Sequence, residues 1–499
     1  MSKRPFVVPG GASPAPLLPA RTFAVALALA ASVALASPPP EAAQPAPPPA
    51  DDSVWITLGA DVFERAQYQL APGPVGAPLP RVAEARGVVV TRIPRAQIDA
   101  LSEIVHREFR RCGGFVAHQS LAAAEAALAR LSEPRPERAA LPFVIDQPVW
   151  VDLLASDVSE LQLLGTMTSL STLFPNRYHA HHAIHHSADW IRDLWLSYAT
   201  GRPDVTVELY SHGGLTPQPS VILTIPGSTL PAEYVILGGH QDSTRFGCSI
   251  EINPNCDAPG ADDDGSGIAT LSEVIRVALL HDFRPQRTVQ FIGYAAEEVG
   301  LYGSEDIAGD YLAAGTNVVA VLNQDMTAYQ GSVQDVAMIT DYTDAELTAF
   351  VVDLLETYQT GLVWTTDFCG YACSDHAPWD ERGFRSAFAF EAQFGTNPYI
   401  HSSADTVASL GGSAAHAAKF ARLAAAFLVE TTLDGEVLPF LDGFETSDTS
   451  RWSSHVPSAP GAPRRPRPAQ GRAGASSARS TGSSPTVRSQ CGVRRNHQR

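Results

Sequence analysis

The feature that most constrains the fold is an alternation of short apolar runs with helical periods between residues 141 and 436. The runs YVILGG, TVQFIGY and VVAVLNQ have the length and composition of strands that are covered on both faces. Helical periodicity occurs between and after them, in SGIATLSEVIRVALL, SEDIAGDYLAAG, AELTAFVVDLLETY and SAAHAAKFARLAAAFLVE. This alternation predicts a layered α/β domain.

Each of the three apolar runs ends in side chains that can bind a metal. The first continues into His240 and Asp242, the second into Glu297 and Glu298, and the third into Asp325. Because sites in α/β sheets form from loops at the carboxyl ends of strands, we expect these side chains to converge. Imidazoles and carboxylates without thiolates suit zinc or a related divalent ion.

Two further motifs supply candidate ligands. Three aspartates precede a helix in PGADDDGSG, and NPYIHSSADT contains His401. Taken singly, each motif has an ordinary explanation, since a loop histidine finds hydrogen-bond partners and aspartates cap helices. Five such motifs together favour two metals that share one carboxylate. Glu297 and Glu298 are adjacent, and neighbours on a strand point to opposite faces, so these two carboxylates are expected to take different roles.

Seven motifs with sensible spacing follow one another through residues 141 to 432: GGHQDS, APGADDDGSG, YAAEEVGLYGS, LNQDMT, ITDYTD, CGYACSDHAPW and NPYIHSSADT. Together they resemble the bacterial leucyl aminopeptidase family, whose members are secreted two-zinc exopeptidases. The resemblance implies a three-layer α/β/α domain with a mixed, mostly parallel central sheet. It also implies two Zn2+ ions per chain.

The resemblance assigns a role to each candidate residue. The implied metal ligands are His240 and Asp325 for one zinc, Glu298 and His401 for the other, and Asp263 between them, followed by a cis peptide bond to Asp264. Glu297 would be the general base that takes a proton from the bridging water and returns it to the departing amine. Asp242 would fix the tautomer of the His240 imidazole.

The resemblance further implies an apolar pocket for the first side chain of the substrate. Its lining would be Met326, Ile339, Tyr371, Phe390, Phe394 and Ile400. Such a pocket favours Leu-like N-terminal residues, because each buried methylene contributes about 0.8 kcal/mol. Ordinary core packing is the alternative, above all for Ile339 and Phe390. A Cys369–Cys373 disulfide is implied as well, and it would position the loop that holds Tyr371.

The remaining segments predict an exported precursor. Arg21 precedes an apolar run that ends in Ala34, Leu35 and Ala36, which is typical of a signal peptide; a membrane anchor is the alternative. The expected domains are a signal peptide (1–36), a Pro-rich linker (37–50), a small α+β propeptide (51–140), the catalytic domain (141–436) and a low-complexity tail (437–499). RRCGGFVAH in the third segment resembles the prodomain of the same family, and inhibition by it is a hypothesis. A permanent accessory domain is the alternative.

Charge and composition limit the partners. The formal net charge is −18, which argues against nucleic acid as the main partner. We expect a secreted monomer that has no membrane contact in its mature form. A processing protease is expected to activate it, and its expected substrates are peptides or proteins with a free hydrophobic N-terminus. The tail has nine arginines and no acidic residue from position 463 onward and is interpreted as solvated. The histidine-rich segment 179–187 is not expected to form a specific metal site.

Two other functions fit parts of the pattern. Glutaminyl cyclases share the fold and use a similar constellation with one zinc, whereas the five candidate ligands here favour two metals. A peptidase-like binding module would require damaged ligands, and none is damaged.

Overall fold

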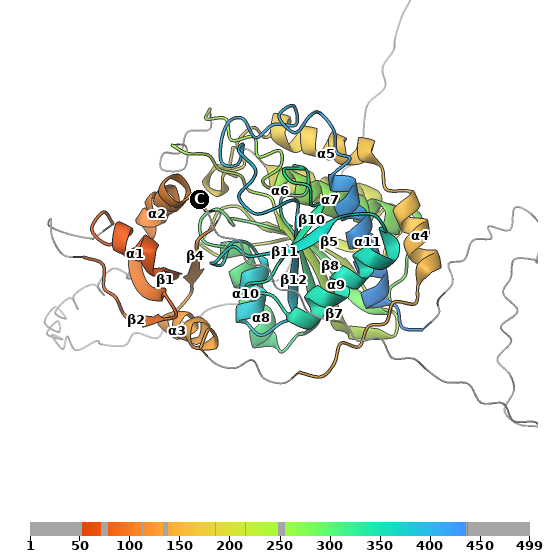
Figure 1. The fold of residues 1–499 in the computed structure, drawn as a ribbon, viewed down its shortest axis with the longest axis horizontal. Helices are drawn as coiled ribbons and strands as arrows, with labels where there is room; N and C mark the ends of the chain where they lie inside the picture. The colour runs from red at the N-terminus through yellow and green to blue at the C-terminus, as the bar shows by residue number, and fades with distance from the viewer. Residues whose placement is uncertain are drawn as a thin grey trace, which may run out of the picture. The chain divides into compact units, whose positions relative to one another are not determined.

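An eight-stranded sheet forms the centre of the larger domain in the computed structural model (Figure 1). Its order is β11-β10-β12-β9-β7-β8-β6-β5. The strands are β5 Thr206–Tyr210, β6 Ser220–Ile225, β7 Leu230–His240, β8 Arg287–Tyr294, β9 Asn317–Gln324, β10 Val336–Ile339, β11 Trp364–Asp367 and β12 Ser386–Phe390. Four neighbouring pairs are parallel, namely β8–β7, β7–β9, β9–β12 and β10–β11. The other three pairs are antiparallel. The predicted mixed, mostly parallel sheet is confirmed.

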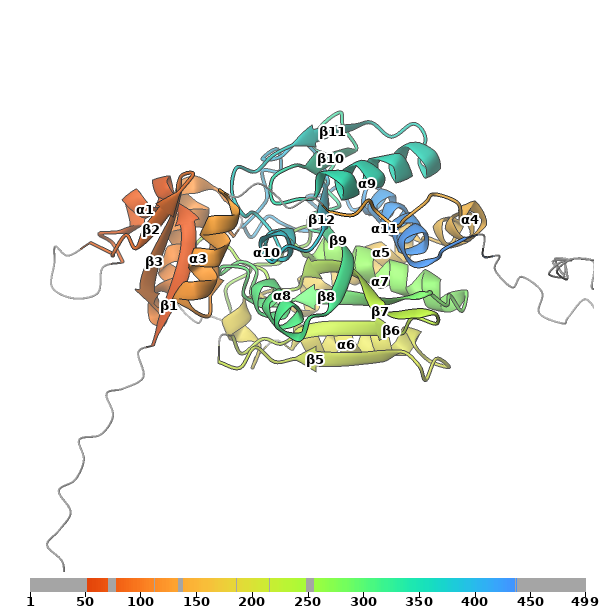
Figure 2. The same ribbon diagram turned by 90° about the horizontal axis from the view of Figure 1, so that it is seen from below.

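Helices cover both faces of this sheet, because its central strands are apolar on both sides. The helices are α4 Pro148–Ser156, α5 Glu160–Leu173, α6 Ser187–Tyr198, α7 Gly265–Leu280, α8 Tyr302–Ala314, α9 Ala345–Tyr358, α10 His376–Glu381 and α11 Ala417–Thr432. On β7, Val235 and Leu237 join the cluster formed with α4 to α7, α9 and α11, whereas Ile236 joins the cluster formed with α8 and α10. Figure 2 shows α8 and α10 on the opposite side from α7 and α11. The three-layer prediction is therefore confirmed.

The described part of residues 51–140 forms a second, smaller sheet in the antiparallel order β2-β3-β1-β4. Its strands are β1 Ser53–Gly59, β2 Ala83–Ala85, β3 Val88–Pro94 and β4 Phe115–His118, and its helices are α1 Ala60–Ala66, α2 Ile98–Ile104 and α3 Leu121–Arg130. One π-helical turn, Val105–Phe109, continues α2. The predicted α+β character is confirmed, and we call this part the pro-segment.

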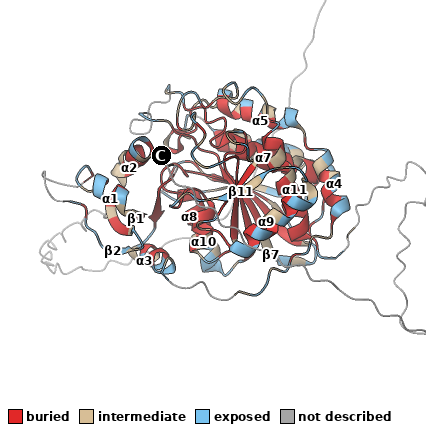
Figure 3. Ribbon diagram, in the orientation of Figure 1, coloured by how far each residue is buried: buried red, intermediate tan, exposed pale blue. Residues whose placement is uncertain are grey.

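The pro-segment and the larger domain share a hydrophobic cluster. Side chains of β1, α1, β3, α2 and β4 pack in it together with Tyr178, Ala295, Ala296, Val299 and Tyr302. Figure 3 shows that burial is densest in the strands of the large sheet, and β8 is buried along its whole length. Its carboxyl end therefore carries the following turn into the interior, against the pro-segment.

The structure describes residues 52–70, 78–111, 113–132, 138–184, 186–214, 216–247, 255–435 and 437. The chain divides into two units, Met1–Val437 and Leu438–Arg499, and the second lies outside the described residues. The predicted signal peptide, linker and tail also lie outside them, apart from residue 437, and the domain boundaries stay predictions. Within the described ranges, no helix is both long enough and apolar enough to cross a bilayer.

Candidate active site

Side chains from the carboxyl ends of three central strands meet in one buried site. His240 is the last residue of β7, Asp325 follows β9, and Glu298 lies in the turn after β8. Asp263 precedes α7, and His401 comes from the loop after β12. All five side chains are buried. The structure thus brings together every metal ligand that the sequence predicted.

Asp263 lies between two groups of donor atoms. Its Oδ1 is 3.1 Å from His240 Nε2, and that nitrogen is 3.5 Å from Asp325 Oδ1. Its Oδ2 is 3.1 Å from His401 Nε2, which is 3.2 Å from Glu298 Oε2. The two oxygens of one carboxylate therefore face different histidines, as a bridging ligand requires.

Several buried nitrogen and oxygen atoms of the site that could bind a metal have no hydrogen-bond partner among the described residues. They are His240 Nε2, both oxygens of Asp263, Glu297 and Glu298, and Asp325 Oδ1. Unpaired buried polar atoms are costly, at about 1–3 kcal/mol each. Their convergence fits divalent cations, and a donor set of imidazole nitrogens and carboxylate oxygens suits zinc.

Asp264 also lies within 4.8 Å of donor atoms of His240 and Asp325. Its oxygens, however, accept the backbone N–H groups of His240, Gly267 and Met326 at 3.0, 2.7 and 3.2 Å. Asp264 therefore ties the ends of β7 and β9 to the start of α7. Asp263, joined to it by a cis peptide bond as the resemblance implied, keeps both oxygens available.

Burial controls the electrostatics of the site. Burial, and then repulsion from Asp263, raises the pKa of Glu298 to about 7. Burial also raises the pKa of Glu297 well above its ordinary value, although the charge of His240 works in the opposite direction. For Asp263, burial opposes ionisation, but the nearby His240 and His401 side chains outweigh it and lower the pKa. A cation would relieve the cost of these buried negative charges.

Comparisons with known proteins identify the family of the chain. The model of peptidase family M28 matches residues 220–427. A probable leucine aminopeptidase of Arthroderma benhamiae is 37% identical over 302 residues, which cover 59% of this chain and 80% of that relative. The chain belongs to peptidase family M28. As an M28 member it is a peptidase and therefore a hydrolase.

Other relatives of this M28 peptidase point the same way. A probable aminopeptidase of Saccharomyces cerevisiae is 37% identical over 268 residues, covering 52% of this chain and 70% of that protein. Among solved structures, LapB from Legionella pneumophila has a TM-score of 0.63 and 26% identity, covering 77% of this chain and 100% of that one. The LapA aminopeptidase of the same organism has a TM-score of 0.61 and 24% identity, and the match covers 77% of this chain and 99% of LapA. The two chains therefore share a fold.

In the M28 site, Asp242 holds the turn that carries both glutamates. Its Oδ1 accepts the backbone N–H of Glu297 at 3.1 Å, and its Oδ2 accepts that of Glu298 at 3.2 Å. The two glutamates therefore lie in a turn after β8, and the expectation based on strand alternation was wrong in its premise. His240 Nδ1 lies 3.2 Å from the backbone oxygen of Asp242 and 3.4 Å from its carboxylate, which leaves Nε2 directed at Asp263.

The predicted pocket residues gather in one apolar cluster beside the site. A cavity of about 430 Å3 is lined by Met326, Phe390, Phe394 and Ile400, and His401 also lines it. Two predicted residues do not line this cavity. Ile339 is fully buried within the cluster, and Tyr371 lies under Arg111 of the pro-segment, whose guanidinium is 5.0 Å from the ring centroid. Cys369 and Cys373 form the implied disulfide.

Two positioning residues were not predicted from the sequence. Asp405 accepts the backbone N–H of Asp262 at 2.9 Å and of Asp263 at 3.1 Å, so it orients the bridging carboxylate. Arg177 is fully buried and donates to the backbone oxygens of Gln241 and Gly260 at 2.8 and 2.7 Å. Asp405 lies four residues after His401 in a motif that was recognised, whereas nothing in the sequence around Arg177 signals its role.

The histidine-rich segment lies apart from the predicted ligands. His182, His186 and Asp189 offer donor atoms within 4.8 Å of one another, and they are partly or fully exposed. His186 pairs with Asp189 at 3.3 Å. Since exposed groups of this kind are common without a metal, the prediction of no specific site stays a prediction.

Proposed function

We propose that this M28 peptidase is a two-zinc aminopeptidase that removes Leu-like residues from peptides and proteins with a free hydrophobic N-terminus. The observation that carries the proposal is Asp263, whose two oxygens each lie 3.1 Å from a different histidine. Imidazole nitrogens in the donor set favour zinc over the all-oxygen sites of calcium and magnesium. A single-zinc cyclase would leave one of the two donor groups unused.

The chain's own residues support hydrolysis. Two cations held by the five predicted ligands would supply Lewis acidity, which activates water and polarises the peptide carbonyl. Glu297 takes the proton of the attacking water and passes it to the departing amine, and its buried carboxylate has no hydrogen-bond partner among the described residues that would hold either oxygen back from this exchange. Asp242 keeps Glu297 in place through the backbone hydrogen bond at 3.1 Å.

The apolar cavity supports the substrate preference. Its volume of about 430 Å3 accommodates a leucine side chain, and Met326, Phe390, Phe394 and Ile400 supply aromatic and aliphatic parts of its wall. His401, one of the proposed metal ligands, also lines the cavity. A free α-amino group would then lie among the carboxylates of the site, which attract its positive charge.

We also propose that the chain is exported and that a processing protease removes residues 51–140 to give an active monomer. The pro-segment lies directly on the general base, since a Cβ added to Gly113 would be 3.2 Å from Glu297 Oε1. Leucyl p-nitroanilide hydrolysis should therefore rise after clipping near residue 140. Equal activity before and after clipping would refute the latent state.

Hydrolysis of leucyl p-nitroanilide and of its N-acetylated form tests the main proposal. The clipped enzyme should cleave only the free-amine substrate, with about two zinc ions per chain by elemental analysis. Glu297→Gln should lower kcat at least ~100-fold and leave the zinc content unchanged. Glu208→Gln, on the exposed face of the edge strand β5, is the matched control and should change neither. Equal cleavage of the acetylated substrate would exclude an aminopeptidase.

A further inference from the structure

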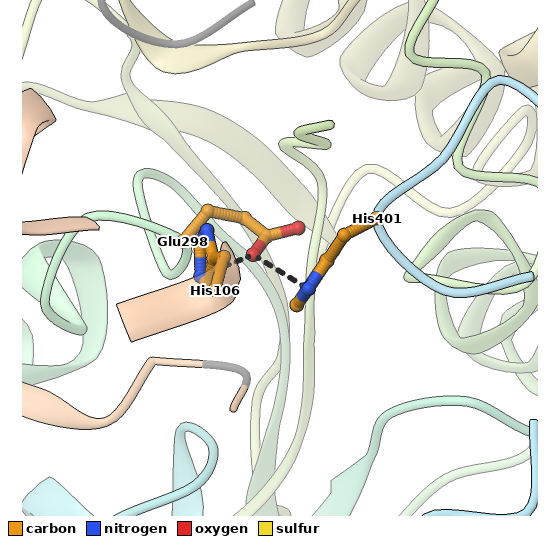
Figure 4. A group of neighbouring side chains, drawn as sticks. All are labelled: His106, Glu298 and His401. Carbon is orange, nitrogen blue, oxygen red and sulfur yellow. Dashed lines mark ion pairs between the residues drawn. The ribbon is translucent and has the colours of Figure 1, made fainter. Parts of the chain in front are cut away.

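The pro-segment inserts a histidine among the proposed zinc ligands. His106 lies in the π-helical turn Val105–Phe109 and is only 2% exposed. Its Nε2 is 3.5 Å from Glu298 Oε2, and its ring centroid is 4.3 Å from that of His401. Figure 4 shows His106 and His401 on either side of the Glu298 carboxylate. Donor atoms of all three residues lie within 4.8 Å of one another.

A hydrogen-bond relay fixes the tautomer of His106. The Ser102 hydroxyl donates to the backbone oxygen of Glu298 at 2.7 Å, which uses its only proton. Ser102 Oγ lies 3.3 Å from His106 Nδ1, so it can only accept there, and Nδ1 must carry the hydrogen. His106 Nε2 is therefore left with a free lone pair, the form in which imidazole binds a metal.

His106 Nε2 has no hydrogen-bond partner within the described chain. A histidine that served only to fill space would leave this buried acceptor unsatisfied, which destabilises the folded chain. The neighbouring Glu298 has both carboxylate oxygens in the same condition. An acceptor nitrogen and an anionic carboxylate do not satisfy each other, whereas a cation between them would satisfy both.

The surrounding pro-segment is anchored firmly enough to hold this geometry. Glu103, one turn before His106, accepts the backbone N–H of Gly247 at 2.9 Å. The backbone N–H of Ala117 donates to Gly300 at 3.0 Å, and His118 pairs with Glu305 at 2.9 Å. These contacts lie on both sides of His106 in the sequence, so the π-helical turn is fixed at two ends.

From this geometry we infer that His106 is a removable ligand of the cation held by Glu298 and His401. In the full chain it occupies a coordination position that water or substrate needs, and removal of the pro-segment frees that position. The inference rests on the proposed function, because it requires a cation at this site. It adds a specific chemical basis for latency to the steric cover that Gly113 provides over Glu297.

Metal release from the full-length chain tests the inference without relying on activity. The zinc-loaded protein is mixed with a chromophoric chelator, and the release rate of each zinc is followed by absorbance. His106→Phe keeps a ring against His401 but removes the nitrogen. It should release one of the two zincs about 10-fold faster or more, since loss even of a contact that only supports a ligand lowers metal affinity about 10–100-fold. Ser102→Ala, which removes the acceptor for Nδ1, should shift the rate in the same direction by less. His106→Ala serves if the phenylalanine variant does not fold.

His118→Gln is the matched control, because His118 is a buried histidine of the same pro-segment that pairs with Glu305. Because His118→Gln weakens one anchoring contact but removes no nitrogen that faces Glu298, it should change the zinc release rate far less than His106→Phe. Cobalt-substituted full-length protein gives a second readout, since loss of an imidazole changes the visible spectrum in His106→Phe but not in His118→Gln.

The outcomes separate this inference from the proposed function. If the wild-type chain binds two zincs and His106→Phe matches it in release rate and cobalt spectrum, the ligand assignment is wrong and the aminopeptidase proposal stands. If His118→Gln accelerates release as much as His106→Phe, loosening of the pro-segment explains the effect and the assignment again fails. If the wild-type chain binds no zinc at either donor group, both proposals fall.

Discussion

Replacement of Asp242 tests whether one buried carboxylate holds the turn that carries the general base and a metal ligand. Asp242 is fully buried, and its two oxygens accept the backbone N–H groups of Glu297 and Glu298. In Asp242→Ala both N–H groups remain buried without an acceptor. In Asp242→Asn the amide oxygen can accept one of them, while the amide NH2 faces the other.

The magnitude follows from the number of hydrogen bonds lost. An unsatisfied buried donor costs about 1–3 kcal/mol, so Asp242→Ala should lower the free energy of unfolding by about 2–6 kcal/mol. Asp242→Asn loses one acceptor and should lower it by about half as much. Activity should fall as well, since the turn positions Glu297, and loss of such supporting contacts reduces activity or metal affinity about 10–100-fold.

Urea unfolding followed by circular dichroism measures the stability change, with a chelator present so that metal binding does not contribute. Asp353→Asn, an exposed position on α9, is the control and should stay within about 0.5 kcal/mol of the wild type. An Asp242→Ala variant within 1 kcal/mol of the wild type would show that the turn does not depend on this carboxylate. An Asp242→Asn variant that is less stable than Asp242→Ala would lead to the same conclusion.

Exhaustive chelation of the clipped enzyme should abolish peptidase activity, and zinc should restore it; full activity without bound metal would refute metal catalysis. Phe390→Ala should reduce the preference for leucyl over alanyl p-nitroanilide about 10-fold or more, mainly through KM, because it removes a wall of the cavity; an unchanged preference would place the side-chain pocket elsewhere. Burial, and then the charge of Lys419, lowers the pKa of His416 to about 4 although the hydrogen bond to the Glu391 backbone oxygen opposes the shift. As the pH falls, His416 is therefore protonated in the unfolded chain before it is protonated in the folded chain. The free energy of unfolding should fall by up to about 3 kcal/mol as the pH drops from about 6.5 to 4. Urea midpoints should show a smaller loss in His416→Gln, and identical losses would exclude His416 as the cause.

Much of the large domain could be predicted because its strands are apolar on both faces. YVILGG, TVQFIGY and VVAVLNQ correspond to β7, β8 and β9, the three adjacent parallel strands at the centre of the sheet. Parallel strands end at one edge, so the ligands after them had to converge. The motifs that resemble the two-zinc family then selected Asp263 from three consecutive aspartates, and its two histidine contacts agree with that choice.

The parts that sequence did not predict depend on how separate segments pack together. The hydrogen bond from Ser102 to Glu298 joins residues 196 positions apart, and it exists only because the pro-segment packs on the turn after β8. No local pattern distinguishes His106 from any other histidine in an amphipathic helix. Likewise, Ile339 belongs to the predicted apolar set, but the strand position that buries it fully could not be assigned before the pairing of β10 was known.

The hydrophobic cluster shared with the pro-segment affects the processed enzyme as well. Loss of residues 51–140 would uncover Tyr178, Ala295, Ala296, Val299 and Tyr302, all of which are buried in the full chain. These side chains adjoin the turn that carries Glu297 and Glu298, so a water-exposed apolar rim would surround the newly opened entrance. Longer peptides with hydrophobic residues after the cleaved bond could cover this rim, whereas a dipeptide is too short to reach it.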